Sequence, residues 1–149
     1  MSPVWELQRG TYLIYNRVQN AQGQRLAITF NGDQKPVTVT PVGLRNTKQR
    51  WIIERFGPDH FGGSGYRVVP EENPGLEVGW GKAIFTQPMG SSNWSIYNEE
   101  SGAIIKDCER RVSWSINSAT DGAEVIPIND ATGEKQRWVF HRVIEDALP

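Results

Sequence analysis

Residues 49–53 are Gln49-Arg50-Trp51-Ile52-Ile53, and similar runs recur as Asn93-Trp94-Ser95-Ile96-Tyr97 and Gln136-Arg137-Trp138-Val139-Phe140. Their tryptophans are separated by 43 and then 44 residues. A fixed period of roughly 20 to 50 residues is typical of folds built from repeated supersecondary units. The spacing therefore predicts three repeats, which we place at residues 10–56, 65–98 and 102–143.

The length and composition fit one domain. A chain of 149 residues can bury most of its apolar surface in a single core. Because Cys108 is the single cysteine, no internal disulfide is possible, and a reducing compartment is expected. The first residues lack the pattern of a signal peptide, and no apolar run approaches membrane-span length. We expect a soluble, cytoplasmic, monomeric protein with no membrane partner.

Charge and motif content argue against several functional classes. The chain has 16 Lys and Arg residues against 17 Asp and Glu residues, without the basic face of a nucleic-acid binder. Neither of the two histidines, His60 and His141, lies near a second His or Cys at metal-ligand spacing. The acidic pairs fall in predicted turns, where they do not face each other across a cleft. We expect no metal, no cofactor and no enzymatic activity.

Short apolar runs between turn residues predict an all-β chain. Each repeat holds four runs that alternate or are rich in β-branched and aromatic residues, with glycine and proline between them. The twelve expected strands cover residues 10–16, 26–30, 37–40, 51–56, 65–69, 76–80, 82–86, 94–98, 102–107, 112–116, 123–128 and 138–143.

Three four-stranded repeats favour a β-trefoil, a short barrel closed by three hairpins. One repeat alone would leave unpaired strand edges and a solvent-exposed apolar face. Three repeats around a pseudo-threefold axis pair the edges and bury the apolar faces. A three-bladed propeller has the same strand count, but propellers typically need at least four blades. We therefore expect a single trefoil domain in which Trp51, Trp94 and Trp138 are equivalent core anchors.

A trefoil without a catalytic set is expected to act through its loops, and sugar binding is one candidate function. The Gln-x-Trp element at Gln49 and Gln136 resembles that of ricin-B-type lectins, in which an Asp and an aromatic ring of one repeat hold a sugar. By that resemblance, Asp107, Trp114 and Asn129 form a site in the third repeat. The element marks the fold more than the function, however, because its Trp lies inside.

A second resemblance covers more of the chain and points to protease inhibition. It is carried by Gly10-Thr11-Tyr12, residues 30–41, Gln49-Arg50-Trp51, Val112-Ser113-Trp114-Ser115-Ile116, Asp121-Gly122 and Lys135-Gln136-Arg137-Trp138. These segments resemble mushroom β-trefoil serine-protease inhibitors of the cospin and cnispin type. The resemblance implies a cytosolic defence protein that inhibits trypsin-like proteases through one rigid, substrate-like surface loop.

The same resemblance places the inhibitory loop between the second and third strands of repeat one. It implies Asn31 as the P1 residue and Gly32 as P1′, with further contacts from Phe30, Asp33, Gln34 and Lys35. Pro36 restricts the exit of this loop. Asn-Gly is also the preferred pair of a tight hairpin turn, so a purely structural role for these two residues is an equal alternative.

Other P1 residues and other targets stay open. Trypsin-like S1 pockets prefer Lys or Arg, which makes Arg45 and Lys135 alternatives to Asn31. Asparagine at P1 also suits an asparagine-specific cysteine protease. We expect the inhibitor function first and the lectin function as the alternative, with a storage trefoil that binds no ligand as a third hypothesis.

Overall fold

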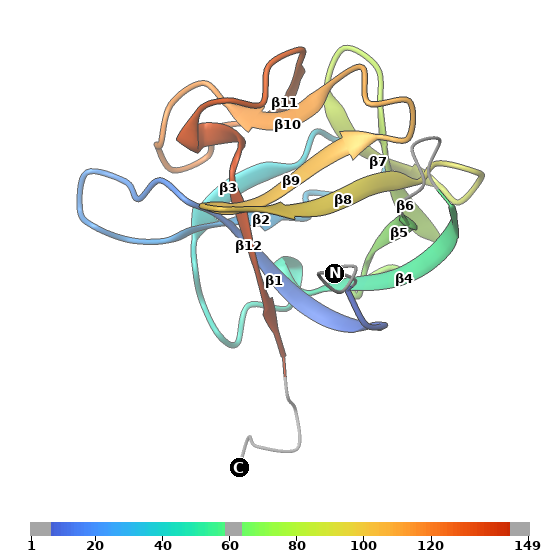
Figure 1. Ribbon diagram of the computed structural model, residues 1–149. Helices are drawn as coiled ribbons and strands as arrows, with labels where there is room; N and C mark the ends of the chain where they lie inside the picture. The colour runs from blue at the N-terminus through green and yellow to red at the C-terminus, as the bar shows by residue number, and fades with distance from the viewer. Residues whose placement is uncertain (1–6, 59–63, 144–149) are drawn as a thin grey trace.

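The computed structural model describes residues 7–58 and 64–143. It contains two short 3-10 helices, η1 (Thr47–Gln49) and η2 (Glu134–Gln136), and twelve strands (Figure 1). The strands are β1 (Gly10–Asn16), β2 (Leu26–Thr29), β3 (Thr38–Pro41), β4 (Trp51–Pro58), β5 (Ser64–Pro70), β6 (Leu76–Trp80), β7 (Ile84–Pro88), β8 (Trp94–Glu99), β9 (Gly102–Asp107), β10 (Ser113–Ile116), β11 (Val125–Ile128) and β12 (Trp138–Arg142).

Six strands close into a barrel. β1 pairs with β4, β4 with β5, β5 with β8, β8 with β9, β9 with β12, and β12 again with β1, all antiparallel. The same register recurs in each repeat, because Trp51 faces Pro70, Trp94 faces Asp107 and Trp138 faces Asn16. Closure leaves no barrel strand with an unpaired edge, which confirms the β-trefoil prediction.

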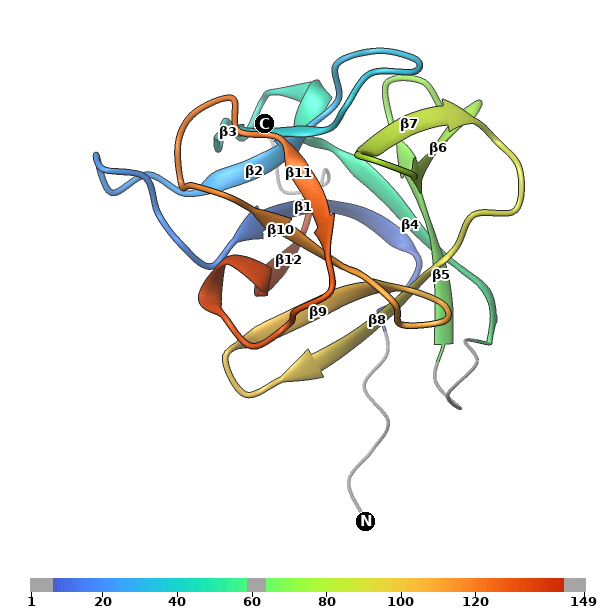
Figure 2. The same cartoon turned by 90° about the horizontal axis from the view of Figure 1, so that it is seen from above.

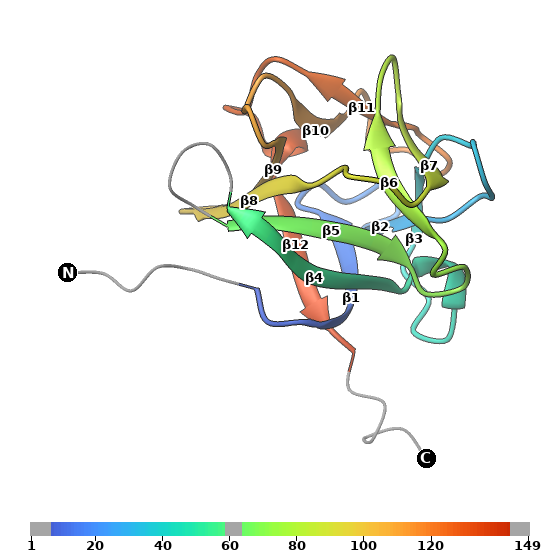
Figure 3. The ribbon, with the colours of Figure 1, turned by 90° about the vertical axis from the view of Figure 1, so that its right-hand side faces the viewer.

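The other six strands form three hairpins, β2–β3, β6–β7 and β10–β11. Figure 2 shows them around the barrel axis, and Figures 1 and 3 show β6–β7 and β10–β11 beyond one end of the barrel strands. Backbone hydrogen bonds join neighbouring hairpins, as from Val37 N to Ile84 O and from Val39 N to Ala123 O. The hairpins of different repeats therefore complete each other's backbone hydrogen bonds.

The three spaced tryptophans are equivalent core anchors, as predicted. Trp51, Trp94 and Trp138 are fully buried. Each indole Nε1 donates to a backbone carbonyl in the second strand of its own repeat: Ile28 at 3.0 Å, Val78 at 2.9 Å and Trp114 at 3.1 Å. A large apolar ring thus enters the core while its one polar atom is satisfied.

Strand boundaries differ from the predictions mainly beside the hairpin loops. β7 begins at Ile84 instead of residue 82, because Ala83 O accepts from Gly81 N in the hairpin turn, and β11 begins at Val125 instead of residue 123, because Ala123 O accepts from Val39 N of another hairpin. The helices η1 and η2 were not predicted; their last residues are the glutamines of the Gln-x-Trp elements. No described helix has the length and apolar content needed to cross a membrane.

Candidate functional site

A surface pocket of about 220 Å³ lies where repeats two and three meet. Its walls come from the end of β6, the loop between β7 and β8, and the turn between β9 and β10. The lining residues are Trp80, Ser91, Ser92, Asn93, Asp107, Cys108, Glu109 and Arg111. The pocket therefore combines one aromatic face with a mostly polar lining that offers several hydrogen-bonding groups.

Trp80 supplies the aromatic face. In each repeat, one residue of the second strand accepts the indole hydrogen bond, and Trp80 lies two residues after that acceptor. The residues at the same position in the other repeats are Phe30 and Ile116, and both are buried. Trp80 packs on the core but stays half-buried at the pocket. The guanidinium carbon of Arg111 lies 5.4 Å from the ring centroid, and the Arg111 side chain is 60% exposed. A solvated side chain thus lies over this ring.

Asp107 shapes the opposite wall. Its Oδ1 accepts the backbone N–H groups of Arg111 at 2.6 Å and Val112 at 2.9 Å, and its Oδ2 lies 3.1 Å from Arg111 Nε. These bonds close the β9–β10 turn, in which Arg110 adopts a left-handed backbone with φ 56°. The exposed Glu109 carboxylate lies 3.2 Å from Arg111 Nε. Asp107 is thus a buried turn anchor, and the solvated groups are Glu109 and Arg111.

The corresponding junctions of the other repeats differ. Between repeats one and two, Thr47 donates to Glu72 at 2.9 Å and Lys48 lies 3.6 Å from the same carboxylate, which closes the gap. Between repeats three and one, a wider polar pocket is lined by Arg17, Val18, Gln19, Asn20, Arg25 and Glu134, without an aromatic ring. Of the three junctions, the one at Trp80 joins an aromatic face to polar groups.

The loop at residues 31–36, predicted to be inhibitory, is pinned to the second repeat. Thr86 Oγ1 donates to Gly32 O at 2.6 Å, Gln34 N donates to Thr86 O at 2.8 Å, and Pro36 forms a bridge with Phe85. Gly32 has a φ of 115°, which glycine adopts without strain, and Gln34 has a φ of 63°. The loop is therefore held by contacts from outside its own repeat.

The Asn31 side chain faces its own loop. Its Nδ2 donates to Thr29 O at 3.3 Å, Pro36 O at 3.0 Å and Thr38 Oγ1 at 2.9 Å. An amide engaged in this way braces the loop, whereas a P1 side chain must project into the protease. Asn31, Asp33, Gln34 and Lys35 are exposed in the loop, but the Asn31 amide is the one engaged by these hydrogen bonds, and Phe30 is buried against Trp51.

The alternative P1 residues lie on two other loops. Arg45 is exposed next to Leu44, a large apolar side chain that is 67% exposed. Lys135 lies in η2, and its Nζ donates to Asn117 O at 3.0 Å. Asn31, Arg45 and Lys135 lie in three separate inter-strand loops, the first two in repeat one and the third in repeat three.

The sugar site expected in repeat three, from Asp107, Trp114 and Asn129, is wrong in its aromatic member. Trp114 is fully buried and packs edge-on against Trp94 and Trp138, with centroids 5.1 and 6.3 Å away. Sequence reasoning missed Trp80, although Gly79-Trp80-Gly81 ends an alternating run with an aromatic between glycines. Of these two tryptophans, Trp80 reaches the surface, because the core encloses Trp114.

Within residues 7–58 and 64–143, no group of three or more His, Cys, Asp or Glu side chains is placed to hold a metal ion. His141 is exposed in β12. His60 lies outside the described residues.

The sequence from residue 10 to residue 138 matches the family model described as CCL2 lectin-like. The chain belongs to the CCL2 lectin-like family. The match spans most of the chain and assigns a lectin-like family in place of the mushroom inhibitor family that the sequence resembles. No curated protein sequence matches this CCL2 lectin-like chain.

Solved structures share the fold of the CCL2 lectin-like chain. The Rhizoctonia solani agglutinin is 16% identical with a TM-score of 0.72, over 95% of this chain and 100% of that one. The Macrolepiota procera ricin B-like lectin, solved with lactose, is 18% identical with a TM-score of 0.68, over 93% and 100%. A mosquitocidal holotoxin is 14% identical with a TM-score of 0.77, but the chain covers only 18% of its length. At these identities the likeness concerns the fold.

Proposed function

We propose that this protein is a carbohydrate-binding lectin without catalytic activity and that the pocket beside Trp80 is its saccharide site. The observation that carries the proposal is the half-buried Trp80 ring beside Ser91, Asn93, Glu109 and Arg111. One face of a pyranose ring is lined by C–H groups that pack on an indole, and its hydroxyls need donors and acceptors at the rim. Membership of a lectin-like family supports the same function.

The charges at the pocket favour a neutral saccharide. Asp107 and Glu109 contribute two carboxylates, against the one guanidinium of Arg111. The carboxylate of a sialic or uronic acid would be repelled by this excess of negative charge, whereas the hydroxyl groups of a neutral sugar donate readily to a carboxylate. The volume of about 220 Å³ is below the roughly 300 to 1,000 Å³ of drug-sized sites. We infer that one sugar ring enters and that neighbouring rings lie on the surface.

Arg111 then acts as a movable cover. Its guanidinium stacks over Trp80 in the free protein, where the sugar ring would bind. The side chain is 60% exposed and its ion pair with the exposed Glu109 is screened by solvent, whereas the buried Asp107 keeps two backbone N–H donors when the guanidinium moves. After moving aside it can donate several N–H groups to sugar hydroxyls.

An array of neutral and acidic oligosaccharides, followed by calorimetry, tests the lectin proposal. We expect the parent to bind neutral glycans, Trp80→Ala to lose at least tenfold in affinity, and Trp80→Phe to retain most of it because a ring remains. Tyr97→Ala is the matched control, since Tyr97 is a partly exposed aromatic that stacks with Arg110 outside the pocket lining. Unchanged binding by Trp80→Ala would place the site elsewhere.

Inhibition of a trypsin-like serine protease is the second candidate function. It is favoured by the pinned loop at residues 31–36, because a preorganised loop loses little entropy on binding and standard-size inhibitor interfaces can then be tight. Lys35 is the exposed basic side chain of the loop, and because Pro36 follows it and proteases cleave poorly before proline, we take it as a contact beside the P1 residue Asn31. An asparagine-specific cysteine protease is the other target class.

A protease panel separates the two functions. If the loop inhibits, Lys35→Ala raises the inhibition constant for trypsin at least tenfold, and Trp80→Ala leaves it unchanged. Arg45→Ala and Lys135→Ala test the alternative P1 residues in the same assay. A parent that inhibits no serine or cysteine protease of the panel would remove this candidate and leave the lectin function standing.

A further inference from the structure

Repeat two departs from the other repeats at the residue two positions before its core tryptophan. In repeats one and three this position is Gln49 and Gln136, and both are buried. Gln49 accepts from Gly43 N at 2.9 Å, and Gln136 accepts from Gly133 N at 2.8 Å. Each glutamine thereby ties the preceding loop to the barrel. In repeat two the equivalent residue is Ser92, whose side chain is too short for this role.

The missing amide is supplied from the neighbouring hairpin. Gln136 donates to the Ser115 hydroxyl at 2.7 Å, and Gln49 reaches the Thr29 hydroxyl at 3.4 Å. The equivalent of these two residues is Gly79. A Cβ at Gly79 would lie 2.6 Å from Gln87 Nε2, so the Gln87 amide of β7 occupies the space that a side chain would fill. Gln87 then donates to the Ser92 hydroxyl at 3.0 Å.

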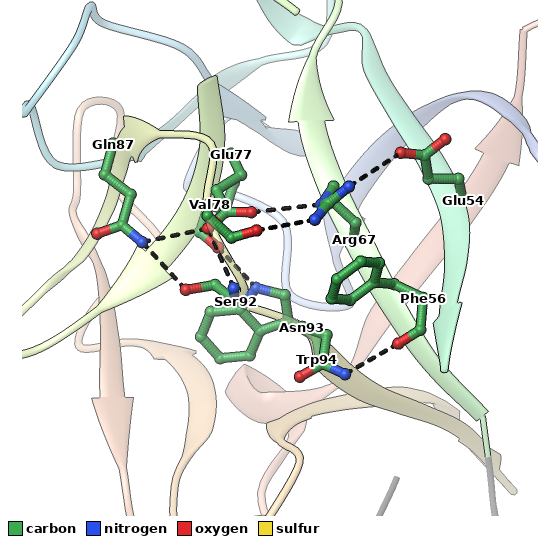
Figure 4. Close-up of polar contacts among 10 residues, drawn as sticks. Glu54, Phe56, Arg67, Glu77, Val78, Gln87, Ser92, Asn93 and Trp94 are labelled. Atoms are coloured by element: carbon green, nitrogen blue, oxygen red, sulfur yellow. Dashed lines mark hydrogen bonds and ion pairs between the residues drawn. The ribbon is translucent and has the colours of Figure 1, made fainter. Parts of the chain in front are cut away.

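A buried carboxylate completes this anchor. Glu77 is fully buried, and its Oε2 accepts from Ser92 N at 3.1 Å and from Gln87 Nε2 at 3.3 Å (Figure 4). Its Oε1 lies 3.4 Å from Arg67 Nε. A buried charge is tolerated only when it is paired and hydrogen-bonded, and Glu77 is hydrogen-bonded through Oε2, whereas Oε1 contributes the ion pair with Arg67 alone.

Arg67 holds the same loop from its other end. Its guanidinium stacks on Phe56 at 3.9 Å, lies 3.7 Å from Glu54 and donates to Gly90 O at 2.9 Å. Figure 4 shows the arginine between the two glutamates, with Phe56 against its face. The loop of residues 88–93 is thus fixed at Gly90 by Arg67 and at Ser92 by Glu77.

We infer that Glu77 and Arg67 are a positioning pair that sets the wall of the saccharide pocket, an inference that rests on the proposed lectin function. Ser91, Ser92 and Asn93 form that wall, and Trp80 follows Glu77 by three residues on β6. The pair does not line the pocket itself. A wall fixed before the ligand arrives lowers the entropy lost on binding, so the pair raises affinity through the loop it holds.

Amide hydrogen exchange and the oligosaccharide array test this inference together. For Glu77→Ala we expect at least tenfold faster exchange at residues 90–93, with β1 and β12 still protected, and at least a fivefold loss of array signal. Glu77→Gln retains an acceptor for Ser92 N, so it restores part of both. It also replaces Glu77→Ala if that variant fails to fold.

Gln136→Ala is the matched control, because it removes an equivalent buried anchor from repeat three. It lowers stability but leaves exchange at residues 90–93 and array binding unchanged. Unaltered exchange in both Glu77 variants would overturn the inference, and so would faster exchange with undiminished array binding. A parent that is silent on the array overturns the lectin function instead, and the exchange rates then still decide whether the pair holds the loop.

Discussion

At the scale of single residues, the surroundings of a side chain decide what it contributes. Trp51, Trp94, Trp114 and Trp138 are fully buried, and Trp80 is half-buried beside a pocket. The five share one chemistry, yet only the exposed face of Trp80 is available to a ligand. Asn31 shows the same dependence, because its amide is engaged inside its own loop.

Asn31→Ala tests whether this amide braces its loop. The change removes three hydrogen bonds, including those to Pro36 O and Thr38 Oγ1, from a side chain that is exposed. We expect a loss of about 1 to 2 kcal/mol in the free energy of unfolding, measured by urea denaturation. Asp33→Ala in the same loop serves as the control, with an expected change within about 0.5 kcal/mol.

Tyr12 is expected to make stability depend on alkaline pH. Burial raises the pKa of the Tyr12 hydroxyl, and this effect exceeds the opposing one of Arg142. The unfolded chain therefore releases the proton first, near the usual value of about 10, and higher pH favours unfolding. The stability that Tyr12 contributes is complete below this pH and is lost as pH rises through the higher folded pKa.

The measurement for Tyr12 is a comparison of the parent with Tyr12→Phe by urea denaturation between pH 8 and 11. Because phenylalanine does not ionise, the parent should lose stability relative to the variant above pH 10. The Tyr12 hydroxyl donates to Gln8 O at 2.6 Å, which gives the parent an advantage at pH 8. A difference that stays constant with pH would show that Tyr12 has the same pKa in both states.

At the scale of elements, the short 3-10 helices are the loop anchors of repeats one and three. Each helix ends on a glutamine whose side chain turns inward to bond the loop, with the core tryptophan two residues later. Repeat two has no such helix and uses Glu77, Gln87 and Arg67 instead. Of the three loops that precede a core tryptophan, the β7–β8 loop has a charged anchor and lines the candidate site.

Gln49→Ala and Gln136→Ala measure the strength of these anchors. The Gln49 amide nitrogen donates to Thr40 Oγ1 at 2.9 Å and to Pro41 O at 3.0 Å, in addition to the bond from Gly43 N. Gln136 has fewer bonds within the described residues. Loss of Gln49 leaves more buried groups unsatisfied, so we expect a cost of about 2 to 4 kcal/mol, greater than for Gln136. Equal costs in thermal unfolding would contradict this order.

At the scale of the whole molecule, closure between distant segments holds the fold together. β1 pairs with β12, so the barrel closes only when the two ends of the described chain meet. Pairing over such sequence separations makes folding slow compared with that of helical proteins. The hairpins also bond to one another, so we expect the three repeats to unfold as one unit.

Replacement of each of the three equivalent tryptophans by alanine tests whether the three repeats unfold as one cooperative unit. Trp51→Ala, Trp94→Ala and Trp138→Ala each remove a fully buried ring and leave a buried carbonyl without its donor. We expect each to cost at least about 3 kcal/mol and to keep a single cooperative transition in calorimetry. A separate transition for one repeat would show that the repeats are independently stable.

The amino-acid sequence by itself determined the trefoil. Its 43- and 44-residue spacing, its alternating runs and its glycine and proline turns act locally, so they predicted twelve strands and three anchoring tryptophans correctly. It did not reveal the half-buried Trp80 at the pocket, the engaged Asn31 amide, or the anchor of repeat two. The Asn31 amide bonds residues within its own loop, but that loop takes its shape from distant contacts such as Gly32 with Thr86, and the other two features depend on Trp80 with Arg111 and on Arg67 with Glu77 and Gly90. Only the tertiary structure decided them, because burial and pairing arise when the three repeats pack around one axis.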